Sequence, residues 1–176
     1  MNADEIQFCY HESPIGPLLL SGIEDCLYAL SFPVDGEGLP ADSMWRENPA
    51  SFANARRELD AYFEKKLERF TISYLLRGSQ FQLSVWRALS SIPYGSFVSY
   101  GEIARRVGKP KGAQAVGMAN HANPLPIIIP CHRVIGADGS MVGFGGGIDL
   151  KRLLLTHEGI TLGQTTSSPG QLGFAF

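Results

Sequence analysis

The chain has 176 residues, of which 44% are hydrophobic and 18% are charged, a balance typical of a soluble globular protein with a buried core. An apolar run of about 18 residues is absent, which argues against a membrane span. The first residues also lack the basic-then-apolar pattern of a secretory signal. Three cysteines without framework spacing indicate free thiols, so we expect a reduced protein of the cytoplasm, or of the nucleus in a eukaryote.

The net charge of −2 conceals an asymmetry between two halves of the chain. Residues 1–79 carry 7 Lys/Arg and 13 Asp/Glu, whereas residues 80–160 carry 8 Lys/Arg and 4 Asp/Glu. A basic C-terminal half suits a polyanionic partner, and nucleic acid is the obvious candidate. An imbalance this small also arises by chance, so charge alone leaves the partner open.

The chain begins with predicted strands. A turn signal at residues 13–16 is followed by the apolar residues 18–20, and a second apolar run covers residues 26–32. This pattern predicts a hairpin of two buried strands. Residues 33–40, rich in Gly and Pro, are predicted to form a loop.

A helix and a further strand are predicted before the first boundary. Residues 51–66 place Phe52, Ala55, Leu59 and Tyr62 at helical spacing. Residues 70–76 fit a strand. At Gly78 and Ser79 the charge sign and the periodicity both change, and we expect the boundary between two domains there.

From Ser79 onward the pattern is helical. Ser79 is suited to cap a helix with an apolar face formed by Phe81, Val85, Trp86 and Leu89. The turn-forming residues 92–95 are expected to end it.

A helix-turn-helix is predicted next. Ser99 followed three residues later by Glu102 is typical of a capping box, and the short helix it starts should stop at Gly108. Residues 109–112 form a basic turn, and residues 113–121 form a second helix rich in small residues. Two short helices across such a turn match a motif whose second helix enters a DNA groove. Many helical hairpins share this pattern without touching DNA.

An apolar, proline-bracketed run at residues 124–130 leads directly into Cys131. We expect this run to be extended and buried. Residues 143–147 are predicted to form a glycine-rich loop, residues 149–158 a final helix, and residues 163–176 a disordered tail.

These elements predict an α+β fold in two parts. Residues 1–78 should form an N-terminal α/β domain with a small sheet. Residues 79–162 should form a mostly helical, winged-helix-like domain that contains the helix-turn-helix.

Cys131 is the candidate nucleophile because a thiol reacts only as its thiolate, which needs a base or a positive environment. His132 and Arg133 follow it, and Glu158 on the final helix is placed to orient an imidazole, which would complete a nucleophile–base–orienter relay. Adjacent side chains often diverge, however. Taken alone, Cys-His-Arg fits a buried structural thiol beside surface polar residues better than a reactive one.

A family resemblance changes that balance. Residues 128–134, Ile-Ile-Pro-Cys-His-Arg-Val, resemble the signature of the 6-O-alkylguanine-DNA alkyltransferases, also called methylated-DNA–protein-cysteine methyltransferases. Similar order and spacing extend over about residues 79–160, and more loosely to residues 13–16. The matching groups are Phe81-x-x-x-Val85-Trp86-x-x-Leu89, Ile92-Pro93-Tyr94-Gly95, Val98-Ser99-Tyr100, Val116-Gly117, Asn123-Pro124 and Lys151-x-x-Leu154-Leu155-x-x-Glu158-Gly159.

The resemblance implies a single-turnover DNA repair reaction without an external cofactor. The protein would flip an alkylated guanine, or 4-O-alkylthymine, out of double-stranded DNA and take its alkyl group onto Cys131. His132 would act as base through a water, Glu158 would hold it, and Tyr100 would donate a proton to the guanine ring. We expect a monomer with no membrane partner.

The resemblance also implies the residues that hold the base. Asn123 resembles the family's hinge asparagine, which braces the turn and the cysteine. The backbone of Val134 and of Gly145 would hydrogen-bond the base edges, and Pro126 would line the pocket.

The second predicted helix departs from the family pattern. Members commonly place an arginine there that fills the gap left by the flipped base, whereas this chain has Gln114. A glutamine is shorter and brings no charge. Lys111, Ala113, Gln114 and Arg133 are the predicted DNA contacts, in a minor-groove mode in which phosphate contacts supply most of the affinity.

A metal site is not expected. Some members bind zinc in the N-terminal domain, but the match at residues 13–16 puts Ile23 and Tyr28 where two ligands would lie. Cys9, His11 and Cys26 do not recreate the spacing.

Three other functions compete with repair. A damage sensor of the alkyltransferase-like kind would hold the flipped base without an acceptor thiol, which Cys131 argues against. A winged-helix regulator would leave the lead-in to Cys131 and the distant Glu158 unexplained. A cysteine hydrolase would need an oxyanion signature, and none is apparent.

Overall fold

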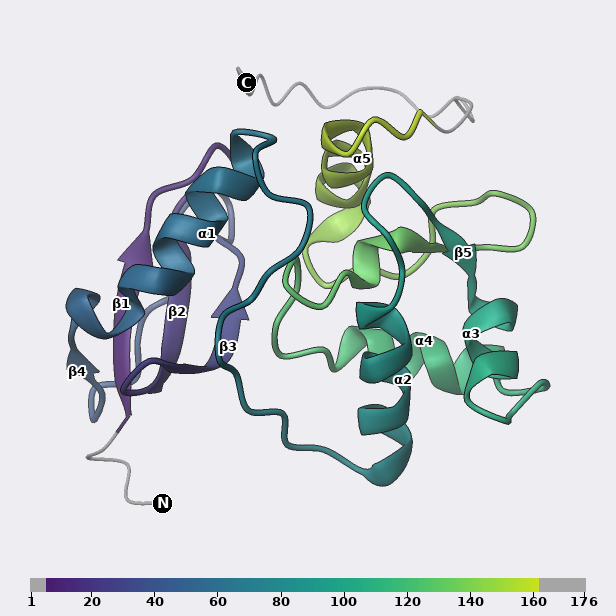
Figure 1. Ribbon diagram of the computed structural model, residues 1–176, viewed down its shortest axis with the longest axis horizontal. Coiled ribbons are helices and arrows are strands. Elements are labelled where there is room, and N and C mark those ends of the chain that lie inside the picture. The colour runs from purple at the N-terminus through teal and green to yellow at the C-terminus, as the bar shows by residue number, and fades with distance from the viewer. Residues whose placement is uncertain (1–5, 162–176) are drawn as a thin grey trace.

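The computed structural model describes residues 6–161, so the predicted tail lies outside the described residues. A small sheet with one helix against it forms one side of the molecule, and the remaining helices form the other (Figure 1). The fold is therefore α+β, as predicted. Within residues 6–161, no helix is long and apolar enough to cross a membrane.

The N-terminal sheet has four strands in the order β3-β2-β1-β4. Their bounds are β1 (Gln7–His11), β2 (Leu18–Ile23), β3 (Cys26–Ser31) and β4 (Arg46–Glu47). The predicted hairpin is β2 and β3, which pair antiparallel. Strand β1 was not predicted, because its buried Cys9 and His11 alternate with the aromatic Phe8 and Tyr10 and give no apolar–polar alternation in the sequence.

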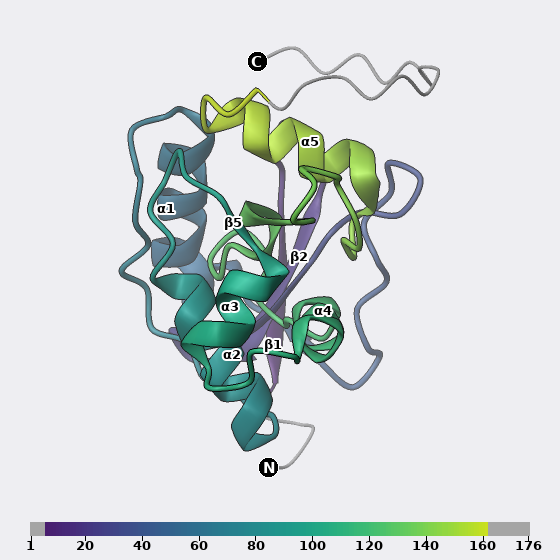
Figure 2. The ribbon, with the colours of Figure 1, turned by 90° about the vertical axis from the view of Figure 1, so that its right-hand side faces the viewer.

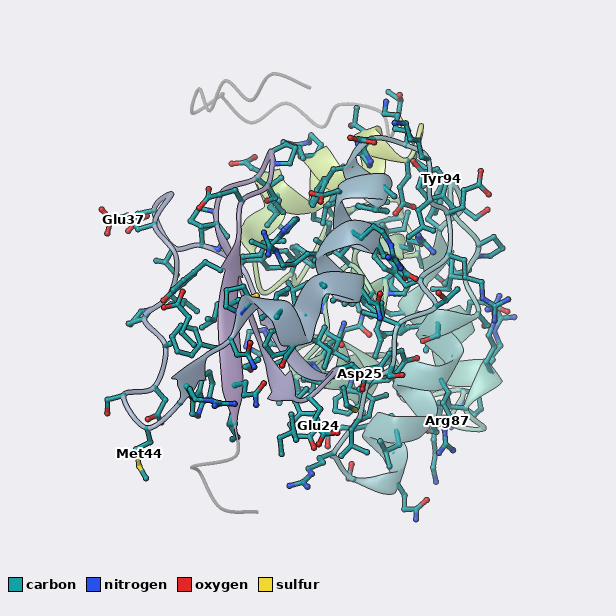
Figure 3. All side chains as sticks on the ribbon, turned by 60° about the vertical axis from the view of Figure 1, so that its left-hand side comes forward. Glu24, Asp25, Glu37, Met44, Arg87 and Tyr94 are labelled. Carbon is teal, nitrogen blue, oxygen red and sulfur yellow. The ribbon has the colours of Figure 1, made fainter. Side chains whose placement is uncertain are left out.

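Helix α1 (Ala53–Phe63) covers this sheet after a short 3₁₀ turn, η2 (Pro49–Phe52). It buries Leu59 and Tyr62 completely, which confirms the predicted amphipathic helix. The loop between β3 and β4 carries Glu37 and Met44, whose side chains point outward from the sheet (Figure 3).

The strand predicted at residues 70–76 is wrong. The segment makes a single bridge, between Tyr74 and Leu27, with two backbone hydrogen bonds of 3.0 Å to Leu27. Its apolar residues Phe70, Ile72 and Leu76 pack against the core instead. Burial of these side chains explains the apolar pattern without a ladder of strand pairs.

Four helices form most of the C-terminal part, and their bounds are α2 (Gln80–Ser90), α3 (Tyr100–Arg106), α4 (Ala113–His121) and α5 (Gly147–His157). Helix α2 begins at Ser79 with a complete capping box. At α3 the Ser99 hydroxyl accepts from Glu102 N at 3.1 Å, but the Glu102 carboxylate pairs with Arg105 and Arg106 rather than returning to the cap.

Helices α3 and α4 pack against each other and against α2, as the helix-turn-helix prediction requires (Figure 2). Trp86 Nε1 donates to Ala119 O at 2.9 Å and ties α4 to α2. Strand β5 (Val98–Ser99) pairs in parallel with β6 (Val134–Ile135). This pairing brings the start of α3 next to the segment that carries Cys131.

The run at residues 124–130 is buried but not extended, so half of that prediction is wrong. It coils through turns, with Ile129 N donating to Leu125 O at 2.8 Å and Ile127 at φ +73°. A β-branched residue in the left-handed region is strained, and the surrounding packing must hold it there. Next comes the 3₁₀ turn η3 (Cys131–Arg133).

Candidate active site

Cys131 is the first residue of η3, and its side chain lies in a cleft of about 410 Å³ between the two parts of the chain. The cysteine is 4% exposed. The N-terminal part contributes Leu30 and residues 31–35 to the cleft, and the C-terminal part contributes Asn120, Asn123, Pro126 and Phe144–Gly146. A ligand that reaches the sulfur must therefore enter between these two walls.

Burial makes the Cys131 thiol a weaker acid than an ordinary cysteine. It raises the pKa of this thiol to about 11, while a hydrogen bond from Asn123 and the charge of Lys151 act in the opposite direction. At neutral pH the sulfur therefore carries its proton. The site can use Cys131 as a nucleophile only if another group takes that proton.

His132 is the next residue of η3 and carries a titratable ring. Its side chain is fully buried, and Nε2 lies 2.7 Å from Glu158 Oε1. Burial lowers the pKa of His132, so the ring is neutral near pH 7. Since the carboxylate holds the proton on Nε2, Nδ1 keeps its lone pair, and this buried nitrogen has no hydrogen-bond partner in the described structure.

Glu158 is the centre of a buried polar network that reaches both parts of the chain. It accepts from Arg133 Nε at 2.8 Å, from Arg133 Nη2 at 3.0 Å and from the Tyr62 hydroxyl at 2.9 Å. Burial alone would raise the pKa of Glu158, but His132 and Arg133 outweigh it and hold that pKa at about 2. The carboxylate therefore stays ionised and fixes the imidazole.

The structure corrects the prediction that Arg133 contacts DNA. Its guanidinium is inside the protein, 5% exposed, with Nη1 donating to Ile92 O at 2.6 Å and the group lying over the Tyr94 ring. A buried carboxylate needs a cation nearby, and Arg133 supplies it. Its basic charge marked an internal ion pair rather than the DNA-facing surface.

Tyr100, the first residue of α3, points toward the loop before α5. Its hydroxyl donates to Val142 O at 2.8 Å and to Gly143 O at 3.2 Å. Burial, with a further contribution from Cys131, raises the pKa of Tyr100 to about 12. The phenol is thus neutral at pH 7, and a thiolate at Cys131 would oppose its ionisation further.

Lys151 is a site residue that the sequence analysis did not select. It is fully buried, its ammonium donates to Val142 O at 2.8 Å, and it lies 5.6 Å from the Tyr100 ring centroid. Burial lowers its pKa to about 8. A usable signal was present, because Lys151 lies on the apolar face of α5 beside Leu154 and Leu155.

Asn123 connects the two ends of the coiled run before the cysteine. Its Nδ2 donates to Ile129 O at 2.8 Å, and its Oδ1 accepts from Leu125 N at 3.1 Å. Pro126 and Gly145 both line the cleft. Val134 is fully buried, and its N–H donates to Cys131 O, so its amide is already engaged.

Two family sequence models match the chain. The DNA binding domain of 6-O-methylguanine DNA methyltransferase matches residues 80–160, and the ribonuclease-like domain of the same protein matches residues 6–75. The two matches together cover most of the chain. The chain belongs to the 6-O-methylguanine DNA methyltransferase family.

Relatives in this family are similar along most of their length. The chain is 50% identical to a methylated-DNA–protein-cysteine methyltransferase of Mycolicibacterium paratuberculosis, over 87% of this chain and 92% of the relative. It is 46% identical to one of Methanosarcina acetivorans, over 86% and 97%. Family members therefore share both parts of this chain.

Solved structures of the methyltransferase family agree with the fold. The O6-methylguanine methyltransferase of Mycobacterium tuberculosis superposes with a TM-score of 0.80 at 46% identity, covering 87% of this chain and 92% of that one. A structure of the protein from the same organism in complex with DNA gives a TM-score of 0.79 at 46% identity, over 87% and 91%.

The exposed side of α4 combines a basic group with small and apolar residues. Lys111 and Gln114 are exposed at its start, and Ala113 is half-buried. Met118, which the sequence analysis did not select, is 72% exposed on the same helix. Lys111 is thus a basic group at the start of a surface of small and apolar residues.

Proposed function

We propose that this methyltransferase repairs DNA by moving the alkyl group of 6-O-alkylguanine, and of 4-O-alkylthymine, onto the sulfur of Cys131. The observation that carries the proposal is the cleft with a buried thiol at one wall and a buried His132–Glu158 pair beside it. A neutral thiol, a neutral imidazole and a fixed carboxylate are the parts of an activated nucleophile.

The chemical step follows from these groups. His132 Nδ1 takes the thiol proton through a bridging water, and the sulfur electron pair forms a bond to the alkyl carbon. The carbon–oxygen bond breaks, and its electrons go to the guanine. Tyr100 gives a proton to the guanine ring as negative charge develops there. The thioether is stable, so each protein molecule acts once and needs no cofactor.

Substrate binding requires the alkylated base to leave the duplex, because the sulfur lies in a cleft that a paired base cannot enter. Pro126 and Gly145 would line the space that the base occupies. The backbone of Gly145 and the carbonyl group of Val134, whose N–H already bonds Cys131 O, would meet its edges. Asn123 would hold the run behind Cys131 in place, since it bonds both ends of that run.

DNA would bind along α4. Lys111 would contact a phosphate, Ala113 would approach the groove, and Gln114 would occupy the gap left by the flipped base. The related protein described in complex with DNA supports a DNA-binding role for this domain. We propose that the protein acts as a monomer on double-stranded DNA, in the cytoplasm or, in a eukaryote, in the nucleus.

Single-turnover repair tests the proposal. A duplex with one 6-O-methylguanine is incubated with increasing amounts of protein, and the modified base that remains is measured by chromatography of the digested DNA. We expect one lesion to be converted to guanine per protein molecule, and none with Cys131→Ala. Repeated turnover, or equal loss of the lesion with Cys131→Ala, would refute it.

A further inference from the structure

An asparagine in the active-site cleft has no hydrogen-bond partner. Asn120, on α4, is 5% exposed and lines the cleft that contains Cys131. Neither Oδ1 nor Nδ2 of its amide has a partner in the described structure. Leaving a buried polar group unpaired costs about 1–3 kcal/mol, so natural proteins seldom keep one without a reason.

The amide lies beside the phenol of Tyr100. Asn120 lies one turn after Gly117 on α4, where an added Cβ would meet the Tyr100 ring at 3.8 Å. The amide is near enough to lower the pKa of Tyr100, against the larger opposing effect of burial, but it does not reach hydrogen-bond geometry in the resting protein. The Tyr100 hydroxyl directs its own proton toward two acceptors, Val142 O and Gly143 O. In the resting protein the phenol therefore donates to two carbonyl oxygens, and the Asn120 amide nearby does not bond it.

Proton donation by Tyr100 leaves its oxygen as a hydrogen-bond acceptor without a donor. Once the proton has moved to the guanine, the phenolate oxygen carries negative charge next to the carbonyl oxygens of Val142 and Gly143, which repel it. A hydrogen-bond donor is then required. Lys151 meets the ring from its face and directs a proton to Val142 O, so it does not take up this position at the oxygen.

We propose that Asn120 is a positioning residue whose Nδ2–H group donates to the Tyr100 oxygen when that oxygen becomes a phenolate. The proposal rests on the proposed function. A donor that is unpaired in the resting state and paired when charge develops stabilises the transition state more than the ground state. This accounts for a buried amide whose Nδ2 and Oδ1 both lack a hydrogen-bond partner in the described structure.

Asn120 gives up no proton in this step, and the electrons and protons balance among the other groups. The sulfur–carbon bond forms as the carbon–oxygen bond breaks, and guanine takes the Tyr100 proton. The phenolate, stabilised by Asn120, is later reprotonated by the proton that left the thiol, which returns through His132 and water. The net reaction gives guanine and the thioether.

The test compares a leaving group that needs a proton with one that does not. Methyl transfer from a 6-O-methylguanine duplex releases guanine, whereas alkylation of Cys131 by iodoacetamide releases iodide, which needs no proton donor. Both rates are measured for Asn120→Leu, a change of similar size, with peptide mapping to resolve Cys131 from Cys9 and Cys26. Asn54→Leu, an exposed asparagine of α1, is the matched control.

We expect Asn120→Leu to slow methyl transfer at least about ten-fold, because a hydrogen bond to a charged oxygen is lost. Its iodoacetamide rate should stay within about two-fold of the wild-type rate, and its melting temperature should not fall, because an unpaired buried amide has been removed. In a Tyr100→Phe background, Asn120→Leu should have almost no further effect, since the two residues act as a unit.

Equal slowing of both reactions, a lower melting temperature, or an undiminished effect in the Tyr100→Phe background would assign Asn120 a structural role and overturn the proposal. Wild-type methyl transfer with no effect of Asn120→Leu would overturn this proposal alone. A wild-type protein that transfers no methyl group would overturn the proposed function as well.

Discussion

At the scale of single residues, the reactivity of Cys131 is a problem of proton removal. A thiol whose pKa is about 11 exists almost entirely as its neutral form at pH 7. The thiol is not exposed, and the charge of Lys151 lowers its pKa by less than burial raises it. The protein keeps a neutral imidazole nearby, with one nitrogen fixed by Glu158 and the other unpartnered in the described structure.

The rate of methyl transfer should reveal this arrangement through its dependence on pH. With His132 present, the base removes the proton during the reaction, so we expect a shallow rise between pH 7 and 9. In His132→Asn, only pre-formed thiolate reacts, and the rate should rise about ten-fold per pH unit below the thiol pKa. Rapid-quench measurements of single-turnover rates give both profiles. Identical slopes would remove His132 from the role of base.

Glu158 should make stability sensitive to acid. Its folded pKa of about 2 lies below the ordinary value of 4.5, so its stabilising effect is complete above pH 5 and declines as the pH falls toward 2. Glu158→Gln should destabilise the protein by about 3–5 kcal/mol at pH 7, because Arg133 is left buried without a counter-charge. Urea unfolding at pH 7, 5 and 3 measures this. The difference in the free energy of unfolding between the wild type and Glu158→Gln should shrink at pH 3. A difference that stays constant would contradict a lowered pKa for Glu158.

At the scale of elements, the sequence was most informative where a side chain caps a helix or an apolar face repeats. Ser79 and Ser99 predicted the starts of α2 and α3 because a hydroxyl at a helix start satisfies free amide groups locally. Residues 70–76 and 124–130 were misassigned because an apolar run reports burial, not backbone conformation. In both segments the hydrophobic side chains reach the core without forming a strand.

The uncharged Gln114 at the start of helix α4 should limit the affinity of the protein for DNA. Gln114 is exposed at the start of this helix, where an arginine would add a charge near the DNA backbone. Gln114→Arg should tighten binding to an unmodified duplex about three- to ten-fold at low salt and steepen the salt dependence by about one charge. Fluorescence anisotropy at several salt concentrations measures both.

A matched variant separates position from charge. Met44→Arg adds the same charge at an exposed residue on the far loop beside the sheet, and it should change the affinity much less. Equal tightening by the two variants would show that net charge, rather than the position of residue 114, governs binding.

At the scale of the whole molecule, the N-terminal part contributes directly to the candidate active site. It supplies one wall of the cleft, and the Tyr62 hydroxyl on α1 bonds Glu158 Oε1 across 96 residues of sequence. His157 Nε2 donates in turn to the Tyr62 carbonyl at 2.8 Å. Residue spacing could not predict this connection, because it arises only when α1 and the end of α5 pack together.

Removing that connection should weaken the molecule more than an equivalent change at its surface. Tyr62→Phe deletes a buried hydrogen bond to a carboxylate and should lower the free energy of unfolding by about 1.5–3 kcal/mol. Tyr10→Phe, which deletes two exposed hydrogen bonds, one to Leu39 O and one from Ala41 N, should lower it by less than about 1 kcal/mol. Urea unfolding of both variants makes the comparison, and equal losses would contradict a coupling between the two parts at Glu158.

The destination of the alkyl group is the most direct test of the account. After reaction with a 6-O-methylguanine duplex, the intact protein is weighed and its peptides are sequenced by mass spectrometry. We expect a gain of about one methylene mass on the peptide that contains Cys131, in line with a covalent acceptor role, and an unchanged mass for Cys131→Ala. A methyl group on Cys9 or Cys26, or a repaired duplex with an unmodified protein, would contradict it.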